Sequence, residues 1–187
     1  ECRVRIKSYV QIGLLKEMLS FAGWNLFGLL CSVLRQQGMA ILLNIFFGVI
    51  VNAAYGIANQ VNANLSHFST NMLRAILPQI TKSGGSGDHE RMLRLSALAC
   101  KMALFLMAFF AIPIIIEMPF ILKIWLKTVP ENTTIFCQLI LIFSLLYQLT
   151  FGLMAAITTV GKIKVYQMVV GMVEIFNLPL AWVLIKF

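Results

Sequence analysis

The stretch NAAYGIANQVNANLSHFSTNMLRAILPQI, residues 52–80, decides the fold of this chain. It is long enough for a helix that crosses a bilayer, which needs about 20 residues, but it is rich in amide, hydroxyl and basic side chains. Hydropathy alone would reject it as a membrane span. Whether it crosses determines the orientation of every later segment, so the surrounding sequence has to settle the question.

The surrounding sequence is that of a membrane protein. Of the 187 residues, 60% are hydrophobic and 12% are charged, whereas soluble domains are about 45–50% apolar and about 25% charged. Four further apolar stretches are each long enough to cross about 30 Å of hydrocarbon; they are residues 21–47, 95–118, 133–157 and 166–187. We therefore expect an all-α fold, a polytopic membrane helical bundle.

The distribution of Lys and Arg indicates that residues 52–80 also cross the membrane, because short cytoplasmic loops collect these residues. If the segment crosses, the loops at 1–16, 82–94 and 162–164 share one side and carry nine Lys and Arg, against two on the other side. If it does not, the split is six against five. We predict five spans and a basic cytosolic loop at 1–20. Topology then explains the net charge of +8 better than a nucleic acid partner does.

Residues 52–80 also show a helical periodicity of polarity. Five polar residues recur at steps of four, three, four and three, which places them on one face of a helix; they are Gln60, Asn64, His67, Asn71 and Arg74. Polar side chains are costly against lipid, so this face should point into the protein or into a hydrated cavity. Two interpretations stay open: hydrogen bonds that hold helices together, or the wall of a substrate cavity.

Further polar residues lie inside two of the apolar spans. Arg35 and Gln36 lie in the first span, and Glu174 and Asn177 share a face of the last. Arg35 could pair with Glu174, could extend towards a membrane surface, or could join Arg74 in binding a phosphate, which suits the guanidinium fork. Glu174, with Asn177, is also a candidate for coupling transport to H+ or Na+ movement.

The sequence contains no pattern typical of catalysis or of a metal site. The four cysteines are far apart and have no neighbouring His, and the carboxylates occur singly, so we predict no metal, no cofactor and no acid–base pair. The segment SGGSGDHER, residues 83–91, is expected to be a flexible cytosolic hinge or tether. Residues 119–129 have the pattern of a short amphipathic helix at the membrane surface.

Several stretches, taken in order, resemble a known family. They are SFAGWNLFG (20–28), ILLNIFFG (41–48), NAAYGIANQVN (52–62), ILPQITKS (76–83), FILKIWLKTVPE (120–131) and VGKIKVYQ (160–167). Together they are similar to the second half of bacterial polysaccharide repeat-unit flippases. These flippases belong to the multidrug/oligosaccharidyl-lipid/polysaccharide exporter superfamily, which also holds the MATE drug exporters. The resemblance covers nearly the whole chain and depends on the ordered set, since no single motif is diagnostic.

The resemblance implies one lobe of a transporter in which two lobes rock around a central cavity. The N-terminal lobe and the end of the C-terminal lobe would then be absent from this chain. The implied cargo is a polyprenyl-pyrophosphate-linked oligosaccharide, moved across the bacterial cytoplasmic membrane for surface polysaccharide synthesis. Arg35 and Arg74 would bind the pyrophosphate, and the amides of residues 52–80 would bind sugar hydroxyls. The alternatives are a cation-coupled drug exporter on the same fold and, more remotely, a membrane enzyme acting on polyprenyl-linked sugars.

Overall fold

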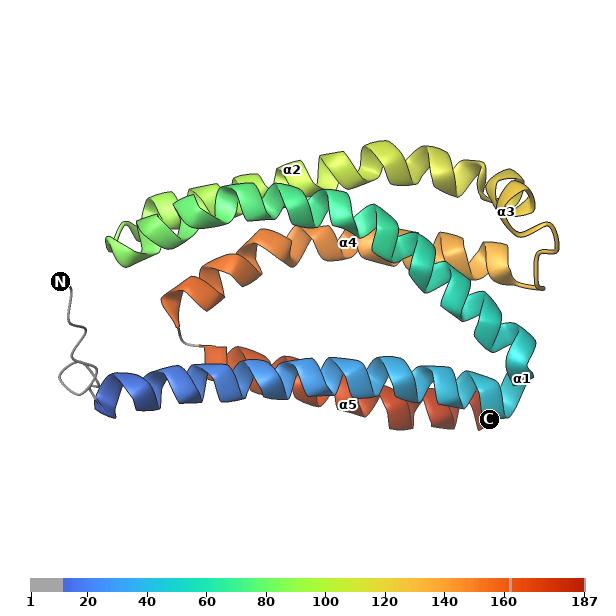
Figure 1. Cartoon of the computed structure of the whole chain (residues 1–187), viewed down its shortest axis with the longest axis horizontal. Coiled ribbons are helices and arrows are strands. Elements are labelled where there is room, and N and C mark those ends of the chain that lie inside the picture. Colours follow the sequence, from blue (N-terminus) through green and yellow to red (C-terminus); the bar gives the residue numbers. More distant parts are fainter. Residues whose placement is uncertain (1–11, 162, 187) are drawn as a thin grey trace, which may run out of the picture. The chain divides into compact units, whose positions relative to one another are not determined.

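The computed structural model describes residues 12–161 and 163–186. In these residues the chain forms five α-helices and no β-strand (Figure 1). The helices are α1 (Ile12–Gly85), α2 (His89–Ile116), α3 (Met118–Leu126), α4 (Thr133–Val160) and α5 (Ile163–Lys186). The predicted all-α class is therefore confirmed.

Four of these helices, α1, α2, α4 and α5, are long and apolar enough to cross a membrane. Their surfaces carry large apolar side chains that the chain leaves uncovered. Phe109 on α2 is 73% exposed, and Phe176 on α5 is 74% exposed. Apolar surface of this extent is unfavourable in water and is typical of helices that face lipid. The helices therefore fit a membrane protein, as the composition predicts.

The longest helix, α1, is divided by one non-helical residue. Gly48 has φ 81° and ψ −179°, a conformation that residues with a Cβ atom rarely adopt. At 1.5 Å per residue, an unbroken helix of 74 residues would be about 110 Å long, several times the thickness of the hydrocarbon core. We call residues 12–47 the first arm of α1 and residues 49–85 the second arm. The predicted spans 21–47 and 52–80 fall in the first and second arm respectively.

The predicted loop at residues 1–20 is wrong in its second part. Residues 12–20 already belong to the first arm of α1. The run Leu14–Leu19 contains residues with high helix propensity and no proline. The helix therefore extends towards the N-terminus beyond the apolar stretch 21–47. Residues 1–11 lie outside the described residues.

The chain forms two compact units, each described by itself. Unit 1 combines Glu1–Gln37 with Gly161–Phe187, and unit 2 is Gly38–Val160. Unit 1 thus holds α5 and most of the first arm of α1, and unit 2 holds the second arm of α1 with α2, α3 and α4. The predicted site residues are divided between the two units in the same way.

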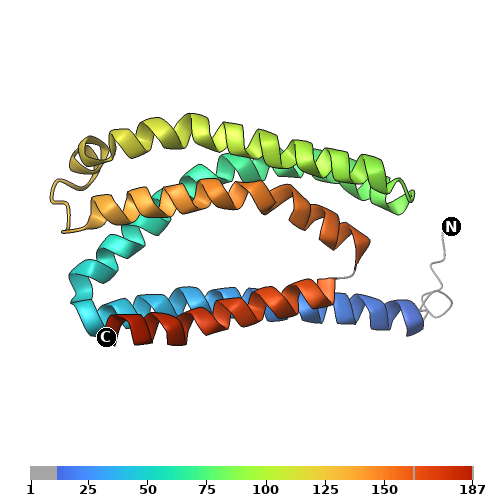
Figure 2. The same cartoon turned by 180° about the vertical axis from the view of Figure 1, so that it is seen from behind.

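In unit 2 the second arm of α1, α2 and α4 lie side by side, and each runs opposite to the one before it in the chain (Figures 1 and 2). Two apolar clusters join the three helices. One contains Leu65 of α1, Met107 of α2 and Leu141 of α4. The other joins Ile80 of α1 to Ala156 of α4 and to residues of α2. Because lipid is as apolar as these side chains, close packing holds such helices together more than the exclusion of water does.

Small residues bring α2 and α4 into close contact. A Cβ atom on Gly152 of α4 would overlap the backbone carbonyl oxygen of Ser96 on α2 and would lie 3.1 Å from the Cβ atom of Ala99. Small residues at such positions let the backbones of membrane helices approach each other. Gly152 is therefore a position at which the α2–α4 contact has no room for a side chain.

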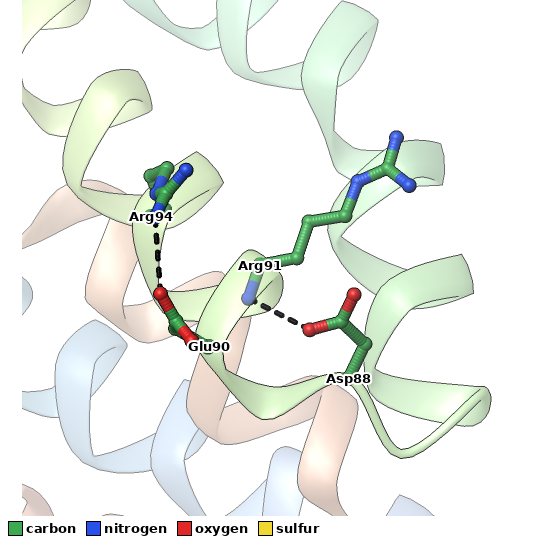
Figure 3. A network of polar contacts seen from close by, with 4 residues as sticks. All are labelled: Asp88, Glu90, Arg91 and Arg94. Atoms are coloured by element: carbon green, nitrogen blue, oxygen red, sulfur yellow. Dashed lines mark hydrogen bonds and ion pairs between the residues drawn. The ribbon is translucent and has the colours of Figure 1, made fainter.

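The turn between α1 and α2 is ordered, and the prediction of a flexible tether is wrong. Helix α1 continues to Gly85, and α2 begins at His89. The backbone N–H of Asp88 donates to the carbonyl oxygen of Ser83 (3.0 Å). The Asp88 carboxylate accepts from the backbone N–H of Arg91 (3.0 Å) and so caps α2 (Figure 3). The Gly- and Ser-rich segment adopts a defined turn because Asp88, which follows its glycines, caps the next helix.

The predicted short amphipathic helix is present as α3. It starts after Glu117 and has Pro119 in its first turn, where the missing N–H of proline breaks no helical hydrogen bond. Met118 and Leu122 are fully buried, whereas Trp125 is exposed. The helix therefore has one face packed on the protein and one face free to contact lipid.

In unit 1, α5 lies alongside the first arm of α1 and runs in the same direction (Figures 1 and 2). A Cβ atom on Gly28 would overlap the side-chain amide of Gln167, and one on Gly171 would lie 2.9 Å from the ring of Phe27. Gln167 Nε2 also donates to Asn25 Oδ1 (3.4 Å). Close packing at glycines and polar contacts such as this one thus hold the two helices together.

Candidate functional site

The second arm of α1 has two faces of different character. One is turned towards α2 and α4 and buries Ala58, Leu65 and Ser69. The other carries five exposed polar side chains, which we call the polar face: Gln60, Asn64, His67, Asn71 and Arg74. All five point away from the helices of unit 2 because the apolar positions between them are the ones that pack.

Other polar residues of the same arm bind to neighbouring helices. The Ser144 hydroxyl of α4 donates to Asn62 Oδ1 (2.5 Å). The Ser69 hydroxyl donates to the carbonyl oxygen of Ala103 on α2 (3.3 Å). These are hydrogen bonds between helices, made by Asn62 and Ser69 and not by the five residues of the polar face, and they satisfy polar groups that would otherwise be buried without a partner.

The polar face makes no contacts of this kind. Among the described residues, none of its five side chains forms a hydrogen bond or an ion pair. Exposed amides, an imidazole and a guanidinium are costly against lipid, so they need water, a polar protein surface or a polar ligand beside them. The polar face therefore needs a polar neighbour other than the described helices of unit 2, either another protein surface or the contents of a hydrated cavity.

The chemistry of the polar face suits an anionic or hydroxyl-rich ligand. Arg74 provides a planar guanidinium with several N–H donors, which binds phosphate oxygens in pairs. The amides and the imidazole provide both donors and acceptors, as sugar hydroxyls require. No carboxylate belongs to the polar face, so it offers a cation no opposite charge.

In unit 1 Arg35 lies beside Glu174. Arg35 Nε and Glu174 Oε1 are 3.9 Å apart, and the two side chains are 38% and 21% exposed. This distance is too long for a hydrogen bond, so the contact is a loose ion pair. Gln36 and Asn177 are exposed on the same two helices. Arg74 belongs to unit 2, so neither unit by itself brings the two arginines together as the predicted phosphate site requires.

We expect Glu174→Gln to lower the free energy of unfolding by about 1 kcal/mol, because Arg35 would lose its opposite charge. Reversible unfolding in detergent, followed by tryptophan fluorescence, measures this change. The double variant Arg35→Gln/Glu174→Gln should recover most of the loss. A single variant as stable as the original chain would show that the ion pair contributes nothing to stability.

The chain was compared with known families, curated proteins and solved structures. No match was found. Within the described ranges, no group of three or more His, Cys, Asp or Glu side chains is placed to hold a metal ion. The cysteines of these ranges, Cys31, Cys100 and Cys137, are free and buried. The polar face therefore stands as the strongest candidate site.

Sequence reasoning misses two polar residues in unit 2. Gln148, inside α4, is 3% exposed; its Nε2 donates to Met107 Sδ (3.1 Å), and its Oε1 accepts no hydrogen bond from any described residue. Lys101 is exposed on α2, with Nζ 5.9 Å from the centroid of the Phe105 ring. The sequence signal for both is a polar residue inside a predicted apolar span. Neither belongs to the polar face.

Proposed function

We propose that the chain is part of a flippase that moves a polyprenyl-pyrophosphate-linked oligosaccharide across the cytoplasmic membrane of a bacterium. The observation that carries the proposal is the polar face, with one positive charge, no carboxylate and no partner among the described residues. Such a cargo combines an anionic pyrophosphate with a hydroxyl-rich sugar. The polar face offers a complementary group to each of these two parts.

The second arm of α1 has to lie in the membrane for this face to meet such a cargo. The arm packs along α2 and α4 through both apolar clusters, and α2 and α4 are long and apolar enough to span a bilayer. We infer that a helix packed along two such helices crosses the membrane with them. The unequal distribution of Lys and Arg between the loops supports the same topology.

In the proposed complex, Arg74 binds phosphate oxygens through charge-assisted hydrogen bonds. The amides of Gln60, Asn64 and Asn71 bind sugar hydroxyls, and the polyprenyl tail stays in the lipid. Arg35 is already paired with Glu174, so Arg74 is the principal phosphate ligand. Glu174, with Asn177 on the same helix, is the proposed site that couples transport to H+ or Na+ movement.

The proposal includes a second lobe of the same polypeptide. One lobe presents only one wall of a cavity, and alternating access requires two lobes that move against each other. The resemblance to polysaccharide repeat-unit flippases points to the same arrangement. The proposal contains no bond-forming or bond-breaking step, so it requires no catalytic residue and no cofactor.

Deletion of the gene that encodes this chain tests the proposed function. We expect lipid-linked repeat units to accumulate on the cytosolic face of the membrane and surface polysaccharide to fall, with both effects reversed by the intact gene. Drug susceptibility is measured in the same strains. Normal polysaccharide together with increased drug susceptibility would contradict the flippase and would instead indicate a drug exporter.

A further inference from the structure

Unit 1 contains an apolar groove between the first arm of α1 and α5. Its volume is about 530 Å³, within the range of about 300–1,000 Å³ that is typical of ligand sites. The groove is lined by Ser20, Gly23, Trp24, Phe27, Met168 and Met172. Its surface is nearly all hydrocarbon, aromatic ring and thioether, so it is suited to an apolar chain.

The lining residues explain why the groove is open and adaptable. A Cβ atom on Gly23 would have no other atom within 4 Å, whereas further along the same helices a Cβ atom on Gly28 or Gly171 would meet the facing helix. The two helices are therefore in close contact on one side of the groove. Met168 and Met172 have flexible, polarisable side chains that can follow the shape of a mobile hydrocarbon chain.

A positive charge lies beside the groove. Lys164 is in the first turn of α5, and its Nζ is 5.5 Å from the centroid of the Trp24 ring, which lines the groove. Lys16 precedes Ser20 by about one turn of α1 and so lies on the same side of that helix, with Glu17 next to it. Counting only the residues that the structure describes, two positive charges and one negative charge lie towards this end of the groove. Trp and Lys together are typical of the boundary between hydrocarbon and headgroups.

We propose that this groove binds a phospholipid with an anionic headgroup, placing one acyl chain along Phe27 and Met168 and the phosphate near Lys164. An apolar groove with a cation at its end matches the two parts of such a lipid, and basic pockets between membrane helices bind anionic headgroups. The exposed side chains of Leu19 and Leu26 put bulk lipid next to the groove. The site goes beyond the proposed function, because it lies in unit 1 and involves no cargo.

Quenching of Trp24 by brominated lipids tests this site in the full chain. Trp125→Phe and Trp182→Phe leave Trp24 as the one tryptophan of the three. The protein is placed in vesicles that mix phosphatidylglycerol with phosphatidylcholine, with bromine on the acyl chains of one lipid or the other. At equal mole fractions we expect the relative association constant to favour phosphatidylglycerol about five-fold, the contribution of one Lys near an anionic surface.

Three variants of this protein separate the groove from general attraction to the membrane. Lys164→Gln should bring the ratio close to one, whereas Lys164→Arg should keep it. Gly23→Leu should fill the groove and lower quenching by both lipids. As the matched control, Lys186→Gln removes a lysine from the last turn of α5, far from Trp24 and the groove, and should leave the ratio unchanged.

Any one of three results would overturn the proposal. One is equal quenching of Trp24 by the two lipids in the starting protein, which would mean that the groove takes any acyl chain. The second is a preference for phosphatidylglycerol that survives Lys164→Gln, and the third is quenching that is unchanged in Gly23→Leu. Each of these two results would place the bound lipid elsewhere on the protein.

Discussion

Gly152→Val is expected to destabilise unit 2 by about 3 kcal/mol, because the α2–α4 contact has no room for a side chain at this position. The new Cβ atom would overlap the carbonyl oxygen of Ser96, which is part of the backbone and cannot rotate away. The two helices would have to separate and would lose the close packing around Ala99. Thermal unfolding in detergent, followed by circular dichroism, measures the loss.

Gly56→Val is the matched control for this variant. Gly56 lies on the second arm of α1 in the same unit and is exposed, and a Cβ atom at this residue would have no other atom within 4 Å. The same substitution should therefore leave stability unchanged or raise it slightly, since glycine is unfavourable inside a helix. If Gly152→Val melted at the same temperature as Gly56→Val, the close α2–α4 contact would not exist in the membrane protein.

Arg74→Ala, in the full-length protein, is expected to reduce export of the surface polysaccharide at least about ten-fold, while the protein still inserts and folds. The loss of hydrogen bonds to a charged group changes affinity by this much or more. Folding should be unaffected because Arg74 is exposed and has no ion-pair partner among the described residues. Export is measured as surface polysaccharide per cell, at equal amounts of protein in the membrane.

Two further arginine variants make this result specific. Arg74→Lys keeps the charge but not the planar fork, so it should restore export only in part. Arg94→Ala removes an exposed arginine that is paired with Glu90 (3.0 Å) near the start of α2 (Figure 3), and it should leave export normal. Normal export from Arg74→Ala would rule out the phosphate-binding role of the polar face.

Periodicity alone predicts which residues make up the polar face, because a helix repeats every 3.6 residues whatever surrounds it. Gln60, His67 and Arg74 are indeed exposed on one side, and Leu65 between them is buried. The all-α class follows equally directly from composition, since only helices and closed barrels satisfy the backbone of a chain in lipid.

The ends of the helices were predicted less well, because local chemistry competes with average composition there. Residues 12–20 look like a basic loop by charge, yet their helix-forming residues continue α1. Residues 83–91 look like a flexible tether by their glycine content, yet Asp88 caps α2 and the turn closes in three residues between Gly85 and His89.

By itself, the sequence determined that the chain is helical and apolar and that one helix carries a polar face. Only the tertiary structure decided which polar residues are bound and which are free. Asn62 and Asn64 are the same residue type two positions apart, but Asn62 meets Ser144 of α4 and Asn64 is exposed. Two positions along a helix point in nearly opposite directions, and α4 packs on one side alone. The partner of a polar residue therefore depends on a helix far away in the chain, which no local pattern contains.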